Sequence, residues 1–265
     1  MIRVEDINKH FGGVRAVNGA SLEIAKGSIT GLIGPNGAGK TTLFNIIAGN
    51  IKPTSGRILL DGEDITGLAP HELFSKGLLR TFQIAHEFSR LTVLENLMMV
   101  PPHQIGENIV SAWFRSSSVR AQERQVREKA MEVIDFLKIG HVAHELAGNL
   151  SGGQKKLIEL GRTMMVDAKV VLLDEVGAGV NRTLLKEIGE AIQRLNTERG
   201  YTFCMIEHDM DFIGKLCNPV ICMAEGAVLA QGTAEEVVKN EAVIEAYLGR
   251  GLKNKPLPNA AGSAA

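Results

Sequence analysis

A glycine-rich loop between an apolar run and an apolar helical pattern constrains this chain most. It reads GPNGAGKT over residues 34–41 and fits the pattern G-x-x-x-x-G-K-[ST]. Glycines permit positive φ and close backbone approach to an anion, and a helix N-terminus adds partial positive charge. A chance glycine-rich turn is the alternative, but the flanking strand and helix favour a phosphate cradle. The residues expected to bind a nucleotide here are Gly34, Pro35, Asn36, Gly37, Ala38, Gly39, Lys40, Thr41 and Thr42.

A second apolar run, VVLLDE, ends in two adjacent carboxylates, Asp174 and Glu175. Taken alone, two solvated acids in a turn would be the simpler interpretation. A nucleotide bound with Mg²⁺, however, needs a carboxylate at the metal, commonly at the end of a neighbouring strand. We therefore predict that Asp174 binds Mg²⁺ together with Thr41, and that Glu175 deprotonates the attacking water. Lys40 is expected to bridge the β- and γ-phosphates.

The segment LSGGQ, residues 150–154, is a second glycine-rich helix start. Ser151 is a good N-cap, and two glycines again permit close approach of the backbone. One nucleotide has a single γ-phosphate. Either both helix starts face it within one chain, or one of them serves a nucleotide held by another copy. Spacing alone leaves both possibilities open, as well as that of an ordinary capped helix.

Strands and helices alternate in the second half of the chain, which predicts a mostly parallel sheet covered on both faces, an α/β fold. The predicted helices span 154–166, 182–199 and 209–217, and the predicted strands span 169–173, 201–206 and 219–224. Short β-like runs open the chain. Residues 103–150 are charged and then amphipathic, which indicates a helical insertion.

Composition excludes several classes of protein. Of 265 residues, 45 % are hydrophobic and 22 % charged, as in globular proteins, and the net charge of −1 gives no reason to expect nucleic acid as a partner. No apolar run approaches the ~18 residues of a membrane-spanning helix, so any role at a membrane requires a docking partner. Three cysteines without metal-like spacing are typical of a reducing cytosol.

GPNGAGKT, LSGGQ and VVLLDE in this order resemble the nucleotide-binding subunit of ABC transporters, and the resemblance covers residues 2–249. It implies one domain over 1–250, with a P-loop NTPase (RecA-like) core, an antiparallel β subdomain and a helical subdomain at about 85–160. Residues 251–265 are expected to be a disordered tail. The resemblance also implies a head-to-tail dimer, homo- or heteromeric, in which two ATP molecules lie between subunits. In it, Ser151, Gly152, Gly153 and Gln154 would contact the ATP of the second subunit.

The same resemblance assigns three further residues. Gln83 in RTFQ would sense Mg²⁺ and the attacking water and would touch the membrane partner. His208 in IEHDM would contact the γ-phosphate, although by itself it would pass for a structural histidine. Phe11 in NKHFGG would stack on adenine, where a core phenylalanine is the simpler interpretation.

A narrower resemblance is to the ATPase subunits of branched-chain amino-acid importers. It is carried by FGGVRAVNGASLEI, RTFQ followed by LTVLENLMM, the insertion with AWFRS, and the ending AVIEAYLG. It implies integral membrane permeases as partners, a substrate-binding protein acting indirectly, and a peripheral place on the cytoplasmic face of a bacterial-type inner membrane. Urea or short-amide import, lipopolysaccharide export and a soluble ABC ATPase are the alternatives. The insertion at about 103–125 favours the importer over the exporter.

The chain departs from the family pattern beside the catalytic glutamate. Val176 stands where family members usually have proline, and Val180-Asn181 stands where Leu-Asp or Leu-Asn is usual. Proline would stiffen this loop. We therefore expect a looser loop, with every charged catalytic group retained.

Overall fold

A six-stranded sheet forms the centre of the computed structural model, which describes residues 1–81, 87–102, 104–105, 116–166 and 168–252. The strand order is β10-β9-β3-β8-β7-β6, with neighbours parallel except for the antiparallel pair β9 and β10. The predicted, mostly parallel sheet is confirmed. The strands are β3 (Ile29–Ile33), β6 (Leu78–Arg80), β7 (Val170–Asp174), β8 (Thr202–Ile206), β9 (Val220–Ala224) and β10 (Ala227–Gly232).

The inner strands of this sheet are buried on both faces. In β7, for example, Val170 and Leu172 pack into one hydrophobic core, whereas Val171 and Leu173 pack into the other. Alternate side chains point to opposite faces of a strand, so a continuous apolar run such as VVLL serves two layers at once.

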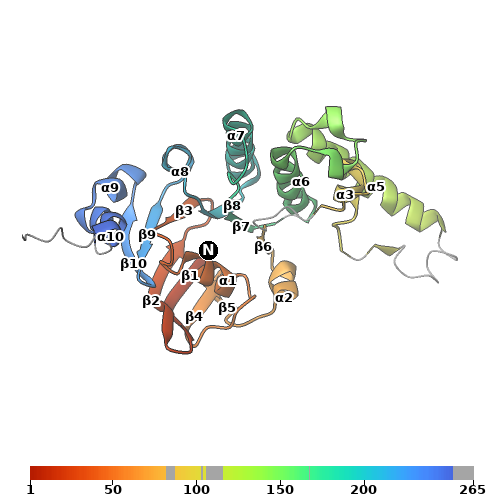
Figure 1. Cartoon of the computed structure of the whole chain (residues 1–265). Helices are drawn as coiled ribbons and strands as arrows, with labels where there is room; N and C mark the ends of the chain where they lie inside the picture. The colour runs from red at the N-terminus through yellow and green to blue at the C-terminus, as the bar shows by residue number, and fades with distance from the viewer. Residues whose placement is uncertain (82–86, 103, 106–115, 167, 253–265) are drawn as a thin grey trace, which may run out of the picture.

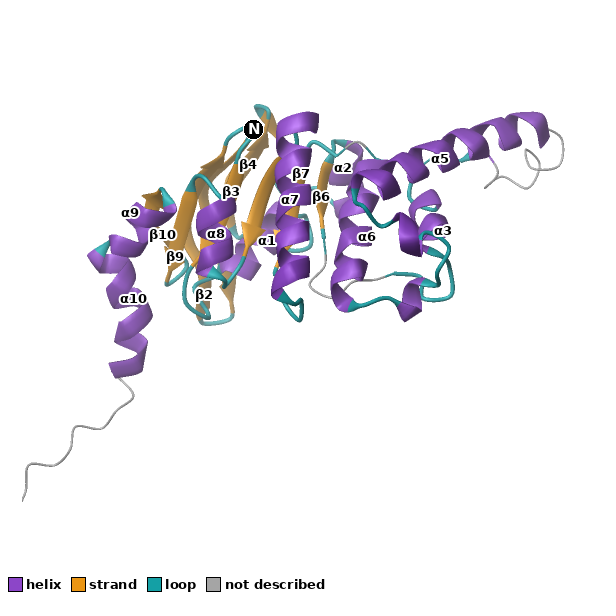
Figure 2. Cartoon of the chain, turned by 90° about the horizontal axis from the view of Figure 1, so that it is seen from above, coloured by secondary structure: helices purple, strands orange, loops and turns teal. Residues whose placement is uncertain are grey.

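Helices cover one face of the large sheet. They are α7 (Arg182–Arg199) and α8 (Met210–Leu216), while α9 (Ala234–Lys239) and α10 (Glu241–Leu252) pack at the β9 and β10 end of the sheet and α6 (Gly152–Met165) lies beside α7 on the β6 side (Figure 2). The predicted helices at 154–166, 182–199 and 209–217 agree with α6, α7 and α8 to within two residues at each end. The predicted strands agree equally well.

The opposite face is covered by α1 (Lys40–Ile47) and by a smaller antiparallel sheet with the order β2-β1-β4-β5 (Figure 1). Its strands are β1 (Ile2–Phe11), β2 (Val14–Ile24), β4 (Ser55–Leu60) and β5 (Glu63–Asp64), and α2 (Pro70–Ser75) follows them. Because Leu43, Phe44, Ile46 and Ile47 are all buried, α1 is fixed between the two sheets.

A group of helices lies beside the sheets on the side of the edge strand β6 (Figures 1 and 2). It contains α3 (Val93–Met98), α5 (Ser116–Phe136) and α6, with short turns η2 (Gly140–Val142) and η3 (Ala147–Asn149). The amphipathic pattern predicted for α5 is confirmed, since Ala130, Val133 and Ile134 are buried and Val126 is half-buried. The expected boundaries of this subdomain, about 85 and 160, stay a prediction.

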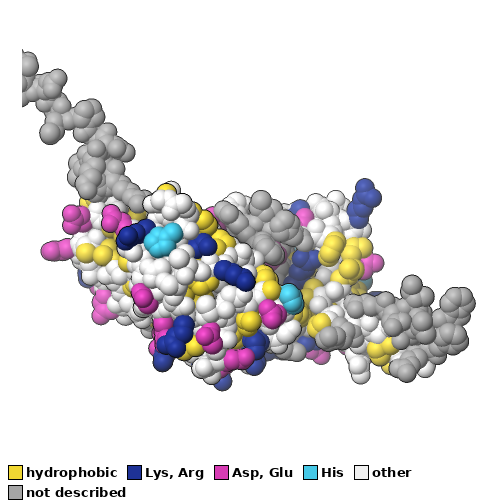
Figure 3. Space-filling model, turned by 90° about the horizontal axis from the view of Figure 1, so that it is seen from below, with side chains coloured by type: hydrophobic (Ala, Val, Ile, Leu, Met, Phe, Trp, Pro, Cys, Tyr) yellow, Lys and Arg dark blue, Asp and Glu magenta, His cyan; other side chains and the backbone are white. Residues whose placement is uncertain are grey.

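The helix α10 continues through Leu252 and therefore includes the first two residues of the segment expected to be a tail. The rest of that segment, 253–265, lies outside the described residues. On the face seen in Figure 3, basic and acidic side chains are interspersed among the coloured residues. This distribution agrees with a net charge close to zero.

Candidate nucleotide-binding site

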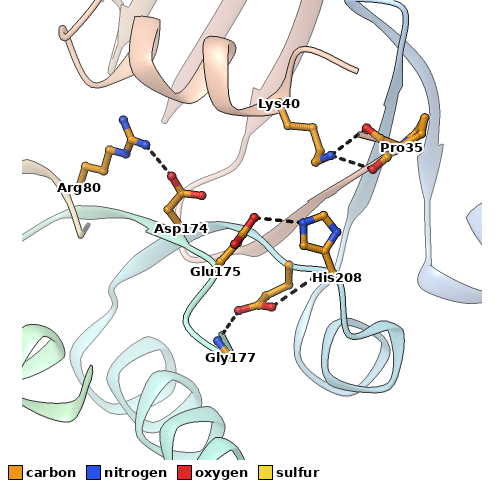
Figure 4. A network of polar contacts seen from close by, with 9 residues as sticks. Pro35, Lys40, Arg80, Asp174, Glu175, Gly177 and His208 are labelled. Atoms are coloured by element: carbon orange, nitrogen blue, oxygen red, sulfur yellow. Dashed lines mark hydrogen bonds and ion pairs between the residues drawn. The ribbon is translucent and has the colours of Figure 1, made fainter. Parts of the chain in front are cut away.

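The predicted site residues follow the carboxyl ends of neighbouring parallel strands. The glycine-rich loop follows β3, Asp174 and Glu175 end and follow β7, and His208 comes shortly after β8. Because β8 lies between β3 and β7 in the sheet, the ring of His208 comes to lie near Lys40 and Glu175 (Figure 4). Ligands of open α/β sheets commonly bind at this edge.

The glycine-rich loop needs its glycines for two separate reasons. Gly34, Gly37 and Gly39 have φ values of 145°, 78° and 96°, which side chains rarely permit. In addition, a Cβ on Gly34 would lie 2.1 Å from the carbonyl oxygen of Met223, and one on Gly39 would lie 2.4 Å from that of Ala16. The loop therefore holds its shape by backbone packing, while Asn36, Gly37 and Thr41 remain exposed.

Lys40 is buried, with 6 % of its surface exposed, and its ammonium group donates to the carbonyl oxygens of Gly34 at 2.7 Å and Pro35 at 3.1 Å. Burial lowers the pKa of Lys40, and the nearby carboxylates of Glu175 and Asp174 act in the opposite direction. The side chain thus curls back over its own loop, where an anion held by the loop would meet it.

Asp174 forms an ion pair with Arg80, which the sequence analysis did not predict. Its Oδ2 accepts a hydrogen bond from Nη2 of Arg80 at 2.5 Å, and Nη1 of Arg80 donates to Oδ1 of Asn45 on α1 at 2.5 Å. Arg80 ends β6, and the parallel pairing of β6 with β7 brings it beside Asp174. The two side chains are only 12 % and 5 % exposed.

Glu175 and His208 contact each other across the strand ends, with 3.1 Å between Oε1 and Nε2 (Figure 4). Glu175 has a φ of 49°, an unusual value for a residue other than glycine, and its N–H donates to the carbonyl oxygen of Ile206. The carboxylate that we expect to act as base is therefore held by a strained backbone and a histidine.

The loop after Glu175 is tethered by a neighbouring acid. Glu207 accepts hydrogen bonds from the N–H of Gly177 at 2.8 Å and from its neighbour His208 at 3.3 Å. Burial raises the pKa of Glu207, and these two N–H groups oppose the rise. Val176 is itself buried in the core under α7. A loop that lacks the family's proline is thus fixed by a buried side chain and a carboxylate.

The LSGGQ segment begins α6 with a reciprocal cap. Ser151 Oγ accepts from the N–H of Gln154 at 3.4 Å, and Gln154 Oε1 accepts from the N–H of Ser151 at 3.0 Å. Ser151 and Gly152 are exposed, whereas Gly153 is buried against α7. This helix start belongs to the helical group and not to the sheet edge (Figure 1).

Two assignments that came from the resemblance have different outcomes. Phe11 ends β1, is 49 % exposed, and has the ammonium of Lys9 5.1 Å from its ring centre, so it is available for stacking and is not a core residue. Gln83 lies outside the described residues.

One contact comes from the far end of the chain. Tyr247 on α10 lies close to Gly34, the first residue of the glycine-rich loop: burial raises the pKa of this phenol, and the backbone of Gly34 acts in the opposite direction. Arg80, Glu207 and Tyr247 were all missed by sequence reasoning. The one signal in the sequence was that each lies in or next to a recognised motif: Arg80 precedes TFQ, Glu207 precedes His208, and Tyr247 lies in AYLG.

Comparison with known proteins gives the family. Residues 17–178 match the model of the ABC transporter family. The chain is 40 % identical over 251 residues to a protein from Archaeoglobus fulgidus named a probable branched-chain amino acid transport ATP-binding protein. That alignment covers 94 % of this chain and 95 % of the relative. This chain belongs to the ABC transporter family.

Other matches agree with this ABC transporter assignment. The high-affinity branched-chain amino acid transport ATP-binding protein of Pseudomonas aeruginosa is 36 % identical, covering 94 % of this chain and 98 % of that protein. A crystal structure of an ABC transporter ATP-binding cassette in its ADP conformation superposes with a TM-score of 0.80. The two sequences are 37 % identical, and the superposition covers 94 % of this chain and 98 % of the cassette. The predicted fold class is confirmed.

The C-terminal part of this ABC protein has a match of its own. Residues 227–253, from β10 into α10, match the model described as branched-chain amino acid ATP-binding cassette transporter. Of the helices in the described ranges, none is long and apolar enough to span a membrane.

Proposed function

We propose that this chain binds and hydrolyses ATP and thereby energises an ABC importer of branched-chain amino acids. The observation that carries the proposal is the meeting of the glycine-rich loop, Asp174, Glu175 and His208 at one sheet edge. The match of residues 227–253 and the names of the relatives support the substrate class. Import of urea or short amides, or lipopolysaccharide export, is the second candidate, since the sequence resemblance extends to those systems.

The residues present suit ATP with Mg²⁺. Any side chain at Gly34 or Gly39 would collide with backbone, so the loop keeps the tight curve in which successive N–H groups can face phosphate oxygens. The hydroxyl of the exposed Thr41 and the carboxylate of Asp174 are hard oxygen ligands of the type that Mg²⁺ prefers. When bound, the metal would neutralise charge on the phosphates.

In this proposal the chain's own residues divide the work. Lys40 would leave the carbonyl groups of Gly34 and Pro35 to hold the β- and γ-phosphates. Glu175 would accept a proton from the attacking water, and His208, already at 3.1 Å, would steady both Glu175 and the γ-phosphate. Phe11 would stack on adenine, and Gln83 would contact Mg²⁺ and the membrane partner.

A second copy of an ATPase subunit would complete each site. Ser151, Gly152, Gly153 and Gln154 stand at a helix N-terminus whose first residues are exposed, as a helix start that binds another subunit's nucleotide would be. ATP would favour this closed dimer and ADP would not, because the γ-phosphate contacts would be lost. We propose permease subunits as the membrane partners and a substrate-binding protein as an indirect one. With these partners the subunit would lie on the cytoplasmic face of the inner membrane.

The decisive experiment replaces Glu175 with Gln. The variant should bind ATP but hydrolyse it at least about a hundredfold more slowly, and it should elute as a dimer with MgATP in size-exclusion chromatography. A monomeric elution together with unchanged hydrolysis would remove Glu175 from the role of base. Uptake of labelled leucine by cells that lack the endogenous ATPase, with Lys40→Ala as the inactive control, tests the substrate class. Uptake of urea instead would favour the second candidate.

A further inference from the structure

Arg80 and Asp174 form an ion pair at the point where the metal is expected. The pair joins Nη2 to Oδ2 at 2.5 Å, and it uses one oxygen of the carboxylate. Both side chains are largely withdrawn from water, at 12 % and 5 % exposure. Arg80 approaches Asp174 from the side away from Lys40 (Figure 4). Salt screens a pair of this kind much less than it screens a surface pair.

The guanidinium group has a second attachment. Its Nη1 donates to Oδ1 of Asn45 on α1, the helix that begins at the glycine-rich loop. Its Nε is buried and has no hydrogen-bond partner among the described residues. Arg80 therefore connects the helix of the phosphate cradle to the acidic strand, and one of its donors is left unsatisfied in the present arrangement.

We propose that Arg80 is the resident counter-ion of Asp174 and leaves this carboxylate when Asp174 takes up Mg²⁺ with a nucleotide. The inference rests on the proposed function, because it needs a magnesium nucleotide at the glycine-rich loop. After leaving, Arg80 keeps its hydrogen bond to Asn45. Arg80 precedes Gln83 by three residues, so its movement would transmit metal occupancy to the segment expected to contact the permease.

Charge decides between this role and a simpler one. If Arg80 only fixed the orientation of Asp174, its loss would weaken metal binding. A divalent cation on the same carboxylate, however, would stand a few ångströms from the guanidinium charge in a poorly hydrated place, with the charge of Lys40 also close. Coulomb repulsion there scales with the product of the charges and with the reciprocal of the low dielectric constant. We therefore expect repulsion to outweigh the benefit of a fixed rotamer, so that loss of Arg80 tightens metal binding.

The test compares the wild type with Arg80→Met, a side chain of similar length without charge. Isothermal titration calorimetry measures the Kd of ADP in EDTA and then in rising Mg²⁺, and the ratio of the two Kd values is the coupling between nucleotide and metal. We expect this coupling to be roughly tenfold larger in Arg80→Met than in the wild type. Arg80→Lys keeps the charge and should stay near the wild-type ratio.

A matched control uses another arginine on a strand. Arg57→Met breaks an exposed pair with Glu5 in the small sheet and should leave the ratio unchanged. Thermal unfolding checks that each variant is folded. A further measurement needs no substitution. It is hydrogen exchange in the wild type at the amide of Thr81, which follows Arg80 in the chain and donates to the carbonyl oxygen of Leu172. This exchange should be faster with ADP and Mg²⁺ than with ADP and EDTA.

Each outcome bears on the proposal. An equal coupling in the wild type and Arg80→Met overturns it, and a smaller coupling in the variant assigns Arg80 a purely orienting role. Should Arg80→Met not fold, unchanged exchange at Thr81 on metal addition overturns it. Absence of ADP binding to the wild type, with or without Mg²⁺, would instead be a failure of the proposed function.

Discussion

Two glycine-rich helix starts in this molecule have similar sequences and opposite surroundings. The loop before α1 is enclosed, because a Cβ on Gly34 or Gly39 would strike backbone within 2.4 Å. At Gly152, the first residue of α6, the nearest atom to such a Cβ is 3.8 Å away and the residue is exposed, whereas the next residue, Gly153, packs against Leu184 on α7. The first helix start is complete within its own chain. The second presents its N-terminus outward, which suits binding to another molecule.

The charges around the two helix starts differ as well. The first has Lys40 within the loop and the carboxylates of Asp174 and Glu175 nearby. The second is capped by the uncharged pair Ser151 and Gln154. A site that must position a charged phosphate and a metal needs the first set, whereas a helix start that only closes over a nucleotide can work with dipoles and hydroxyls.

The largest effect on nucleotide binding is expected from a substitution in the enclosed helix start, the glycine-rich loop before α1. Lys40→Ala removes the buried cation that would move from the carbonyl oxygens of Gly34 and Pro35 to the phosphates, and hydrogen bonds to charged groups contribute about 1.5–3 kcal/mol each. Nucleotide affinity should fall by roughly a hundredfold or more. Fluorescent-ADP titration measures it, with Lys26→Ala on an exposed turn as the control. Unaltered binding would contradict the assignment of the phosphate cradle.

A smaller and different effect is expected from a substitution in the outward-facing helix start, at the N-terminus of α6. Ser151→Ala removes an N-cap, at a cost of about 0.5–2 kcal/mol in stability, but leaves the enclosed loop intact. ADP affinity should stay within about twofold, while hydrolysis falls by roughly tenfold because the two subunits close less tightly. Steady-state ATPase assays and ADP titration separate these effects. If Ser151→Ala instead weakened ADP binding to the monomer, both helix starts would serve one nucleotide.

The parts of the site that the sequence predicted are those encoded locally. The loop at 34–41 carries its geometry in its glycines, and the cap at Ser151 needs only Gln154 three residues later. The alternation of strands and helices was equally clear, because strands buried on both faces form continuous apolar runs. These features depend on neighbours in sequence.

What could not be predicted depends on neighbours in space. Arg80 meets Asp174 only because β6 pairs with β7, which joins residues 94 apart in sequence. Tyr247 comes close to Gly34 only because α10 packs against β10 at the end of the sheet. Polar residues of these types are usually solvated, so no pattern in the sequence distinguishes them from surface residues.

The departure at Val176 illustrates the same point and gives the smallest effect. We expected a looser loop after Glu175. Instead, Oε1 of Glu207, which is 30 residues away in sequence and follows β8, accepts a hydrogen bond from the N–H of Gly177 at 2.8 Å. Glu207→Ala should therefore loosen the loop and lower turnover about threefold to tenfold, in line with the loss of about 1 kcal/mol per hydrogen bond.

Val176→Pro tests this account in two backgrounds. In the wild type the loop is already fixed, so the substitution should change turnover by less than about twofold. In the Glu207→Ala background, the fixed φ of proline should recover part of the lost rate. ADP affinity serves as the internal control, since neither residue touches the phosphate cradle. A large gain from Val176→Pro in the wild type would mean that the tether of Glu207 is weak and that the loop is loose, as the sequence alone suggested.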